Sequence, residues 1–129
     1  MKIKILIVED TEDDLFIVTR YLKKAGYTDI VSAGTLAGGI KRALDEKPDI
    51  VICDTLLPDG NGFDVCREIK TKLGDSSPKI IVTTGSIDAV DAVKARRAGA
   101  DDYCGKTSDC APLLEALGKL AQSIKEKAG

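Results

Sequence analysis

Short apolar segments alternate with longer amphipathic segments along this chain, and this alternation restricts its possible folds more than any other feature. The short apolar segments are predicted to be strands, at residues 4–8, 29–32, 49–53, 79–83 and 101–104. The longer amphipathic segments are predicted to be helices, at residues 12–25, 35–46, 62–73, 87–98 and 109–126. The first, third and fourth strands are almost wholly apolar, which is typical of a parallel sheet covered on both faces. Because strict strand–helix alternation gives parallel strands with right-handed crossovers, we predict an α/β fold.

The size and composition of the chain indicate one domain over residues 1–129, since 129 residues can bury a substantial core. The formal charge of −2, from 21 acidic and 19 basic residues, gives no general reason to expect binding to nucleic acid or to a membrane surface. A structural zinc site is not expected, because the chain has no histidine and no C-x-x-C pair. No apolar run approaches the ~20 residues that span a bilayer, and the N-terminal segment does not resemble a signal peptide, so we expect a cytoplasmic protein.

Chemically reactive groups are predicted to gather at the carboxyl edge of the sheet, where open parallel sheets bind their ligands. The groups that follow or close the strands are Glu9 and Asp10, Asp54, Thr83 and Thr84, and Lys106. Each of them alone has an ordinary interpretation as a solvated strand end, a turn residue or a loop charge. Together they predict a site that contains carboxylates, a hydroxyl group and an ammonium group.

Five carboxylates occupy the six positions from Glu9 to Asp14, and Thr11 divides them into two groups. Thr11 is predicted to be the N-cap of the first helix, with Asp14 in a capping-box-like position and the acids at 12–14 interacting favourably with the helix dipole. Glu9 and Asp10 precede the cap and gain much less from the dipole. We therefore assign the later acids to the helix and keep the earlier two as candidates for the site. At the other end of the chain, Asp109 is expected to cap the last helix.

Carboxylates gathered at one edge repel one another unless a cation lies among them or some are protonated. Mg²⁺ is the preferred candidate, because it takes carboxylate oxygens and keeps positions open for water and phosphate. An ionised aspartate can attack phosphorus without a general base, so the absence of histidine is no obstacle. The charge of the transferred group would be neutralised by the metal, a lysine and a hydroxyl donor. The pattern thus favours aspartyl-phosphate chemistry.

Four segments together resemble the receiver domain of two-component response regulators, of the chemotaxis-regulator type. "ILIVED" is similar to the first strand of that family with its acidic pair, and "CDTLLPDGNGFDVCREIK" to its phosphoacceptor segment. "PKIIVTTG" is similar to the fourth strand with its switch hydroxyl, and "AGADDYCGK" to the approach to the family's lysine. The resemblance covers nearly the whole chain. It implies a flavodoxin-like, doubly wound, five-stranded parallel sheet in the order 2-1-3-4-5, with five helices in a three-layer α/β/α arrangement.

The resemblance also implies roles for particular residues. Asp54 would accept the phosphoryl group, and Lys106 would pair with the phosphoryl oxygens. Glu9, Asp10 and Asp54 would hold Mg²⁺ together with the backbone carbonyl of Leu56. Asp10 would bind the ion directly, and Glu9 would bind it through water.

The switch of the family pairs a hydroxyl with an aromatic side chain. Counting back from residues 98–99 makes Thr84 the switch hydroxyl, whereas counting forward from Pro78 gives Thr83. We favour Thr84, and strand alternation means that the two threonines cannot face the same way. Tyr103 would be the aromatic residue that swings inward when the hydroxyl moves to the phosphoryl group.

The chain departs from the family pattern near the lysine and on the output surface. Thr107 stands where a proline usually follows the lysine, so the usual cis peptide bond is in doubt there, because a cis bond before threonine costs ~3 kcal/mol. The charges around the fourth helix do not match the pattern of DNA-binding dimeric regulators; they are Lys94, Arg96 and Arg97. Leu56 offers no polar side chain beside the site, so we expect a longer-lived phosphoryl group than Leu56→Asn would give.

The expected function is that of a phosphoacceptor. A sensor histidine kinase or a histidine phosphotransfer protein would supply the phosphoryl group to Asp54 in a Mg²⁺-dependent reaction, and a shift between two conformations would signal to a downstream protein partner or an output domain. The domain would phosphorylate and dephosphorylate itself without turning over a separate substrate, so it is not expected to be an enzyme. Direct binding to nucleic acid or to a membrane is not expected.

Three other functions compete with this one. An aspartate-nucleophile phosphatase would commonly have a second aspartate where this chain has Leu56. A flavin or nucleotide binder would need a phosphate loop after the first strand, where the acidic segment would repel phosphate. A degenerate receiver that only binds partners stays open, mainly because of Thr107.

Overall fold

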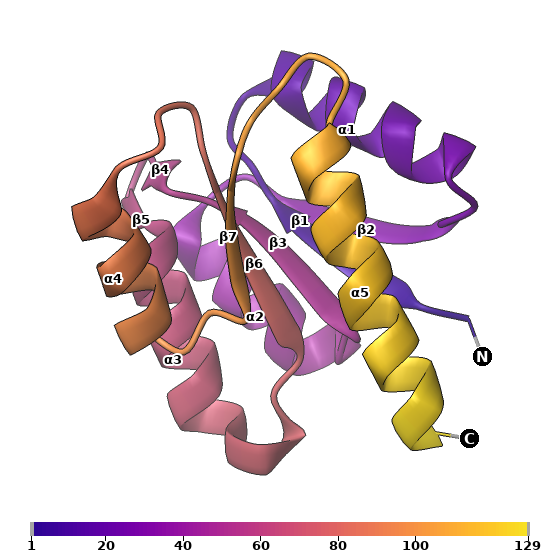
Figure 1. The fold of residues 1–129 in the computed structure, drawn as a ribbon. Coiled ribbons are helices and arrows are strands. Elements are labelled where there is room, and N and C mark those ends of the chain that lie inside the picture. The colour runs from indigo at the N-terminus through magenta and orange to yellow at the C-terminus, as the bar shows by residue number, and fades with distance from the viewer. Residues whose placement is uncertain (1, 129) are drawn as a thin grey trace.

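The computed structural model describes residues 2–128, and within them five strands form one parallel sheet (Figure 1). The strands are β1 (Lys4–Val8), β2 (Asp29–Ala33), β3 (Ile50–Asp54), β6 (Lys79–Thr84) and β7 (Asp102–Gly105). Their order is β2-β1-β3-β6-β7, and all neighbouring pairs are parallel. Counted along the chain, these strands have the order 2-1-3-4-5, so the predicted fold class is confirmed.

Helices cover both faces of this sheet (Figure 1). The helices of the described chain are α1 (Glu12–Lys24), α2 (Leu36–Glu46), α3 (Gly62–Leu73), α4 (Ala89–Arg97) and α5 (Ala111–Ala128). On one face, Leu22 of α1 and Leu117 of α5 pack with the isoleucines of β1 and β3. On the other face, Ile69 of α3 and Ala95 of α4 pack with the valines of β3 and β6, together with α2. Among the described residues, none of these helices combines the length and the apolarity that crossing a bilayer requires.

The apolar strands have the sequence pattern that this layering requires. The residues of β3 are all buried, and so are those of β1 after Lys4, because side chains on either face of these strands meet a layer of helices. A strand in such a position gains from apolar residues at every position rather than at alternate ones. In β3 the only charged residue, Asp54, consequently stands at the end of the strand, at the edge that carries the candidate site.

A short antiparallel hairpin follows β3, and the sequence pattern did not predict it. Its strands are β4 (Leu56–Leu57) and β5 (Gly60–Asn61), with Pro58 and Asp59 between them. A single turn of 3₁₀ helix, Gly74–Ser76, likewise follows α3 without having been predicted. Elements of two or three residues are too short to produce a hydrophobic period, so their existence depends on turn geometry and on neighbouring elements.

The first helix begins in a different way from the one predicted. Thr11 occupies the N-cap position of α1, but within the described chain its side chain makes no capping hydrogen bond. The capping-box interpretation of Asp14 is also wrong, because the Thr11 N–H donates instead to Glu9 Oε2 at 3.2 Å. The carboxylate of Glu9, fixed at the end of β1, thus satisfies the donor that Asp14 was expected to satisfy.

The last helix is closer to the prediction. It begins at Ala111, two residues later than expected, because Cys110 adopts a left-handed conformation with φ of 55°. Asp109 Oδ1 accepts a hydrogen bond from the Ala111 N–H at 3.1 Å, so this aspartate supports the helix start as predicted. Backbone hydrogen bonding lowers the pKa of Asp109, which is the direction expected for an ionised carboxylate that receives an N–H at a helix start.

Candidate functional site

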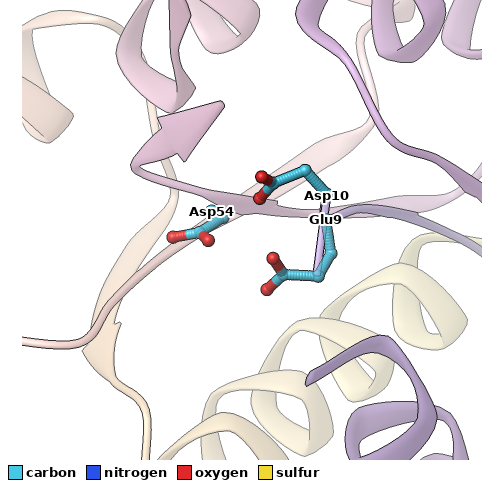
Figure 2. Close-up of side chains that lie close together, drawn as sticks. All are labelled: Glu9, Asp10 and Asp54. Carbon is cyan, nitrogen blue, oxygen red and sulfur yellow. The ribbon is translucent and has the colours of Figure 1, made fainter. Parts of the chain in front are cut away.

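The acidic residues predicted from the sequence meet where β1 and β3 end (Figure 2). Val8 pairs with Cys53 in the register of these neighbouring strands, so the next residues, Glu9 and Asp54, lie side by side. Carboxylate oxygens of Glu9, Asp10 and Asp54 all lie within 4.8 Å of one another. Glu9 and Asp54 are buried, whereas Asp10 is exposed. The parallel pairing of two strands therefore places three carboxylates from distant parts of the chain in one group.

Lys106 follows β7, and its ammonium group contacts three carboxylates. The Nζ atom lies 2.8 Å from Glu9 Oε1, 2.9 Å from Asp54 Oδ2 and 3.0 Å from Asp14 Oδ2. The exposed fractions of these side chains are 4% for Glu9, 10% for Asp54 and 42% for Asp14. The Lys106 N–H donates to the Thr84 carbonyl oxygen at 2.7 Å, which fixes the backbone that carries the side chain. Since an ammonium group has three donors, each of them has a carboxylate partner here.

Burial and charge shift the pKa of two groups in this cluster. Burial raises the pKa of the Glu9 carboxyl to about 7, and the hydrogen bond from Lys106 offsets this shift only in part. Burial works to lower the pKa of Lys106, but its hydrogen bonds to Glu9, Asp54 and Asp14 outweigh that effect and raise the pKa above the ordinary value. Lys106 is consequently a cation at neutral pH. The fraction of Glu9 that is ionised near neutral pH depends on the charges of its neighbours, Lys106 and Asp54.

The backbone of Asp54 is held by contacts that require glycine at position 62. A Cβ atom at this position would clash with the carbonyl oxygen of Asp54. The Gly62 N–H donates to the Thr55 carbonyl oxygen at 3.1 Å, and the Thr55 N–H donates to the Thr83 carbonyl oxygen at 3.0 Å. The first residue of α3 thus packs directly on the end of β3, and this contact fixes the position from which the Asp54 side chain projects.

Leu56, whose carbonyl group was predicted to bind the metal, begins the hairpin that follows β3. The residue is 76% exposed, and its N–H lies 3.4 Å from Asp54 Oδ1. Leu56 lines an open cleft of about 940 Å³ together with Asp10, Asp54 and Thr84. An apolar side chain therefore stands at the edge of this cleft, where a polar one could hold water.

The two candidate switch threonines face opposite sides of β6. Thr84 lines the open cleft with Asp54, and its Oγ1 donates to the Ser86 carbonyl oxygen at 3.0 Å and accepts from the Ser86 N–H at 3.2 Å. Thr83 lies on the other face, where its Oγ1 is 3.5 Å from the Cys53 carbonyl oxygen and borders an inner cavity of about 250 Å³. Both threonines are buried. Thr84 is the one that shares the open cleft with Leu56 and Asp10.

Tyr103 packs inward against the cluster on the α2, α3 and α4 face. It pairs with Val82 in the register of β6 and β7, so Thr84, two residues after Val82, lies on the same face of β6. The Tyr103 hydroxyl group is buried and has no hydrogen-bond partner among the described residues. A buried hydroxyl without a partner carries a cost in free energy that a change of hydrogen bonding nearby could remove.

Asp14 is the site residue that the sequence interpretation missed. We assigned it to the start of α1, but its carboxylate is the third partner of Lys106. The first turn of α1 lies beside the ends of β1 and β3, and this position became visible only once those elements had packed. The signal available in the sequence was a third acid in the first turn of the helix, but acids are common there because they interact favourably with the helix dipole.

Asp59, in the hairpin after β3, has a structural role that was also missed. Its carboxylate accepts hydrogen bonds from the N–H groups of Leu36 at 2.6 Å and Ala37 at 3.1 Å, at the start of α2. These backbone hydrogen bonds lower the pKa of Asp59. The loop that follows Asp54 is therefore tied to the N-terminus of a helix that lies far away in the sequence.

The loop after Lys106 forms a hydrogen-bonded turn. The peptide bond between Lys106 and Thr107 is trans. The Thr107 hydroxyl group donates to Asp109 Oδ1 at 2.8 Å, and the Cys110 N–H donates to the Thr107 carbonyl oxygen at 3.2 Å. Thr107 therefore takes part in the turn that leads into α5.

Comparison with known proteins identifies relatives along most of the chain. A family model described as "Response regulator receiver domain" matches residues 5–118. Protein PilH of Pseudomonas aeruginosa is 32% identical over 114 residues, which cover 88% of this chain and 93% of that protein. The DNA-binding response regulator MtrA of Mycobacterium tuberculosis is 37% identical over 107 residues, which cover 82% of this chain and 45% of MtrA. The chain thus spans nearly all of one relative and less than half of the other.

Solved structures show the same fold. A CheY-like response regulator receiver domain protein from Methanospirillum hungatei has a TM-score of 0.84 and 28% identity, with coverage of 98% of this chain and 99% of that one. The BeF3-activated DrrB receiver domain has a TM-score of 0.80 and 28% identity, with coverage of 95% and 99%. The family model, the relatives and the solved structures all indicate a receiver domain, and the carboxylates and the lysine around Asp54 are consistent with that. This chain belongs to the response regulator receiver domain family.

Proposed function

We propose that this receiver domain, extending over residues 1–129, accepts a phosphoryl group on Asp54 from the phosphohistidine of a sensor histidine kinase or of a histidine phosphotransfer protein. The observation that carries the proposal is the environment of the Asp54 carboxylate. It lies 2.9 Å from the Lys106 ammonium group and in a group of carboxylate oxygens, with those of Glu9 and Asp10, that fall within 4.8 Å. A carboxylate placed between an ammonium group and a candidate cation site is suited to attack phosphorus.

The transfer would break one bond and form another. An Asp54 carboxylate oxygen bonds to phosphorus, the phosphorus–nitrogen bond of the phosphohistidine breaks, and its electron pair stays on the imidazole nitrogen, which takes a proton from solvent. The Lys106 ammonium group faces the oxygens of the transferred group and balances part of their charge. Water later cleaves the acyl phosphate and restores Asp54. The domain would therefore modify and restore itself and turn over no separate substrate, so we do not regard it as an enzyme.

The donor set fits a magnesium ion. The oxygens of Glu9, Asp10 and Asp54 are hard ligands, and their grouping within 4.8 Å leaves like charges that a divalent cation would balance. Asp10, Asp54 and the backbone carbonyl of Leu56 would hold the ion, with Glu9 acting through water, since its carboxylate already accepts a hydrogen bond from Lys106 at 2.8 Å. When bound, Mg²⁺ would supply charge neutralisation at the phosphoryl oxygens.

The conformational signal would involve Thr84 and Tyr103. Thr84 fits this role better than Thr83. Its side chain lines the cleft beside Asp54 and lies on the same face of the sheet as Tyr103 of the neighbouring strand β7. Its hydroxyl group now bonds to the backbone of Ser86, and a phosphoryl oxygen would compete for it. A shift of this hydroxyl group would change the space available to the inward Tyr103 ring and bias one of two arrangements.

The expected partners follow from this chemistry. The kinase or phosphotransfer protein supplies the phosphoryl group, and a downstream protein or an output domain reads the altered surface. We propose a cytoplasmic location and no direct contact of this domain with nucleic acid or membrane, in line with the formal charge of −2. The DNA binding named for MtrA belongs to that longer protein.

Intact-mass measurement tests the proposal. The protein is incubated with Mg²⁺ and acetyl phosphate, and we expect a phosphoryl adduct that hydroxylamine removes and that Asp54→Asn does not form. Asp45→Asn is the control, because Asp45 pairs with Lys41 on the exposed surface of α2. If wild type forms no adduct and binds no beryllofluoride in the presence of Mg²⁺, the proposal is wrong and a degenerate receiver is favoured.

A further inference from the structure

Lys106 has one more carboxylate partner than the proposed reaction needs. Glu9 and Asp54 hold its Nζ atom from the ends of β1 and β3, and their side chains are only 4% and 10% exposed. Asp14 adds a third contact at 3.0 Å from α1, although its side chain is 42% exposed. When Asp54 is phosphorylated, the Lys106 N–H that donates to Asp54 can donate to a phosphoryl oxygen instead. The Lys106 N–H that donates to Asp14 becomes available only if the Asp14 carboxylate moves away from Lys106.

Asp14 also brings a negative charge close to the phosphorylation site. The oxygens of Asp14 and Asp54 lie at 3.0 Å and 2.9 Å from the same nitrogen, so they are at most about 6 Å apart, a distance at which like charges repel measurably. A phosphoryl group on Asp54 would carry its own negative charge into this space. The phosphoryl charge would oppose Glu9 as well, but the Glu9 side chain is buried, so Asp14 is the opposed partner of Lys106 that solvent can most easily receive.

The position of Asp14 between two hollows supports the same conclusion. The open cleft of about 940 Å³ and the inner cavity of about 250 Å³ share three lining residues, which are Asp14, Asp54 and Lys106. The inner cavity is lined largely by apolar side chains such as Ile17 and Leu113, with hydroxyl residues such as Ser108 at its wall. The Asp14 carboxylate already borders the open cleft and is partly exposed, so it can leave Lys106 for the solvent of that cleft.

We infer that Asp14 is a positioning residue that competes with the phosphoryl group for the ammonium group of Lys106. The inference rests on the proposed phosphorylation of Asp54. In the unmodified domain, Asp14 holds the third donor of Lys106 and adds charge that disfavours an incoming anion. Binding of a phosphoryl group, or of an analogue with the same charge and shape, displaces Asp14 from Lys106. Asp14 thus lowers the affinity of the site for the phosphoryl group.

Beryllofluoride titration of the full chain in the presence of Mg²⁺ measures this competition without a covalent step. Asp14→Asn keeps the shape of the side chain and removes its charge, and Asp14→Ser is a second charge-free variant. Asp14→Glu keeps the carboxylate. Asp13→Asn is the charge-matched control, because Asp13 lies in the same helical turn, is exposed, and forms no ion pair within residues 2–128. Thermal unfolding of each variant checks that the fold is retained.

We expect Asp14→Asn and Asp14→Ser to bind beryllofluoride about 2- to 5-fold more tightly than wild type, the range for a partly exposed ion pair. The adduct formed with acetyl phosphate should persist longer in these variants by a similar factor. Asp13→Asn and Asp14→Glu should stay close to wild type. The ¹⁵Nζ resonance of Lys106, assigned with Lys106→Arg, should shift in Asp14→Asn before any beryllofluoride is added, and should not shift in Asp13→Asn.

Equal affinities of Asp14→Asn and Asp13→Asn would overturn the inference and leave the proposed function intact. Weaker binding by Asp14→Asn than by wild type would also overturn it, since Asp14 would then hold Lys106 in place for the phosphoryl group. If wild type neither binds beryllofluoride nor forms an adduct, the proposed function fails, and this inference fails with it.

Discussion

Individual side chains around Asp54 differ in how firmly the fold holds them. Glu9 is buried and is held by Lys106 and by the Thr11 N–H, so its position is set by the ends of the strands. Asp10 and Leu56 are exposed at the cleft, where they can meet a metal ion, a partner or water. Substitutions at exposed residues of the cleft are therefore expected to change chemistry, with smaller effects on folding.

Asp10 and Asp13 lie three residues apart and are predicted to respond differently to loss of charge. Asp10→Asn should weaken Mg²⁺ binding by at least about tenfold, because it removes a carboxylate ligand. Asp13→Asn should leave Mg²⁺ affinity nearly unchanged and cost about 0.3–1 kcal/mol of stability through the helix dipole. Isothermal titration with Mg²⁺ and urea unfolding measure the two effects. Equal Mg²⁺ affinity in both variants would contradict the assignment of Asp10 to the metal site.

Leu56 is predicted to lengthen the life of the phosphoryl group. A polar side chain at this position could orient a water molecule toward phosphorus, and leucine cannot, so Leu56→Asn should speed loss of the phosphoryl group about 3- to 10-fold. Decay of the acetyl-phosphate adduct, followed by intact mass after removal of the donor, measures the rate. Val90→Asn, at another exposed apolar position, serves as the control. The same decay rate in Leu56→Asn and wild type would show that this position does not guide water.

Between elements, the most informative contact joins the β4–β5 hairpin to α2. One hydroxyl group and one carboxylate accept hydrogen bonds from the free N–H groups at the start of this helix. The Thr35 hydroxyl oxygen accepts from the Gly38 N–H at 2.9 Å. The Asp59 carboxylate accepts from the N–H groups of Leu36 and Ala37. The start of α1, in contrast, receives its carboxylate contact at the Thr11 N–H from the preceding strand end. Helix starts on both sides of the sheet are thus linked to the carboxyl edge where the site lies.

Asp59→Asn is predicted to destabilise the fold at neutral pH by weakening this helix cap. The pKa of Asp59 is lowered in the folded state, so its contribution is present above the ordinary value of 3.8 and is lost as the pH falls through the folded pKa. The midpoint of thermal unfolding should drop by a few degrees at pH 7, and the difference from wild type should shrink toward pH 3. Asp75→Asn, in the turn after α3, is the control. A difference from wild type that is independent of pH would exclude a charge-dependent cap.

For the molecule as a whole, the lack of histidine leaves few side chains that change charge between pH 5 and 8. Within residues 2–128, Glu9 is such a side chain, because burial raises the pKa of its carboxyl group to about 7. Its carboxyl group faces Lys106, Asp54 and the Thr11 N–H, which together determine how much of the charge is balanced. The stability of the metal-free domain near neutral pH should therefore report on the candidate site itself.

The metal-free domain is predicted to lose stability as the pH rises from about 5 to about 7. A raised pKa means that the folded state binds the Glu9 proton more tightly than the unfolded state, so the stabilisation is complete below the ordinary value of 4.5 and is lost through about 7. The slope can reach ~1.4 kcal/mol per pH unit for one proton. Mg²⁺ should reverse the trend, because a divalent cation near Glu9 favours the ionised form of its carboxyl group.

Urea unfolding at several pH values measures how the free energy of unfolding changes with pH, with EDTA and with Mg²⁺. In EDTA, Glu9→Gln should remove most of this change between pH 5 and pH 7. A metal-free stability that rises from pH 5 to pH 7 would contradict the assignment of a raised pKa to Glu9.

The family resemblance implied the strand order. The residue pattern itself contained the fold class and the placement of Glu9, Asp10 and Lys106 beside Asp54. These features follow from local pattern: apolar runs indicate buried strands, alternation with helices indicates parallel pairing, and parallel pairing puts Glu9, Asp10, Asp54 and Lys106 at one edge. Each of these inferences needs only the order of residues along the chain and the geometry of one element.

Tertiary structure decided the contacts that depend on how finished elements pack. The third partner of Lys106, the anchoring of Asp59 at α2, and the buried hydroxyl group of Tyr103 belong to this class. Asp14 illustrates the reason: a carboxylate in a first turn has favourable interactions with its own helix, so local rules assign it there. The ammonium group 92 residues away offers a stronger, charge-assisted hydrogen bond. The two groups come within 3.0 Å only once α1 and the loop after β7 have packed at the same edge of the sheet.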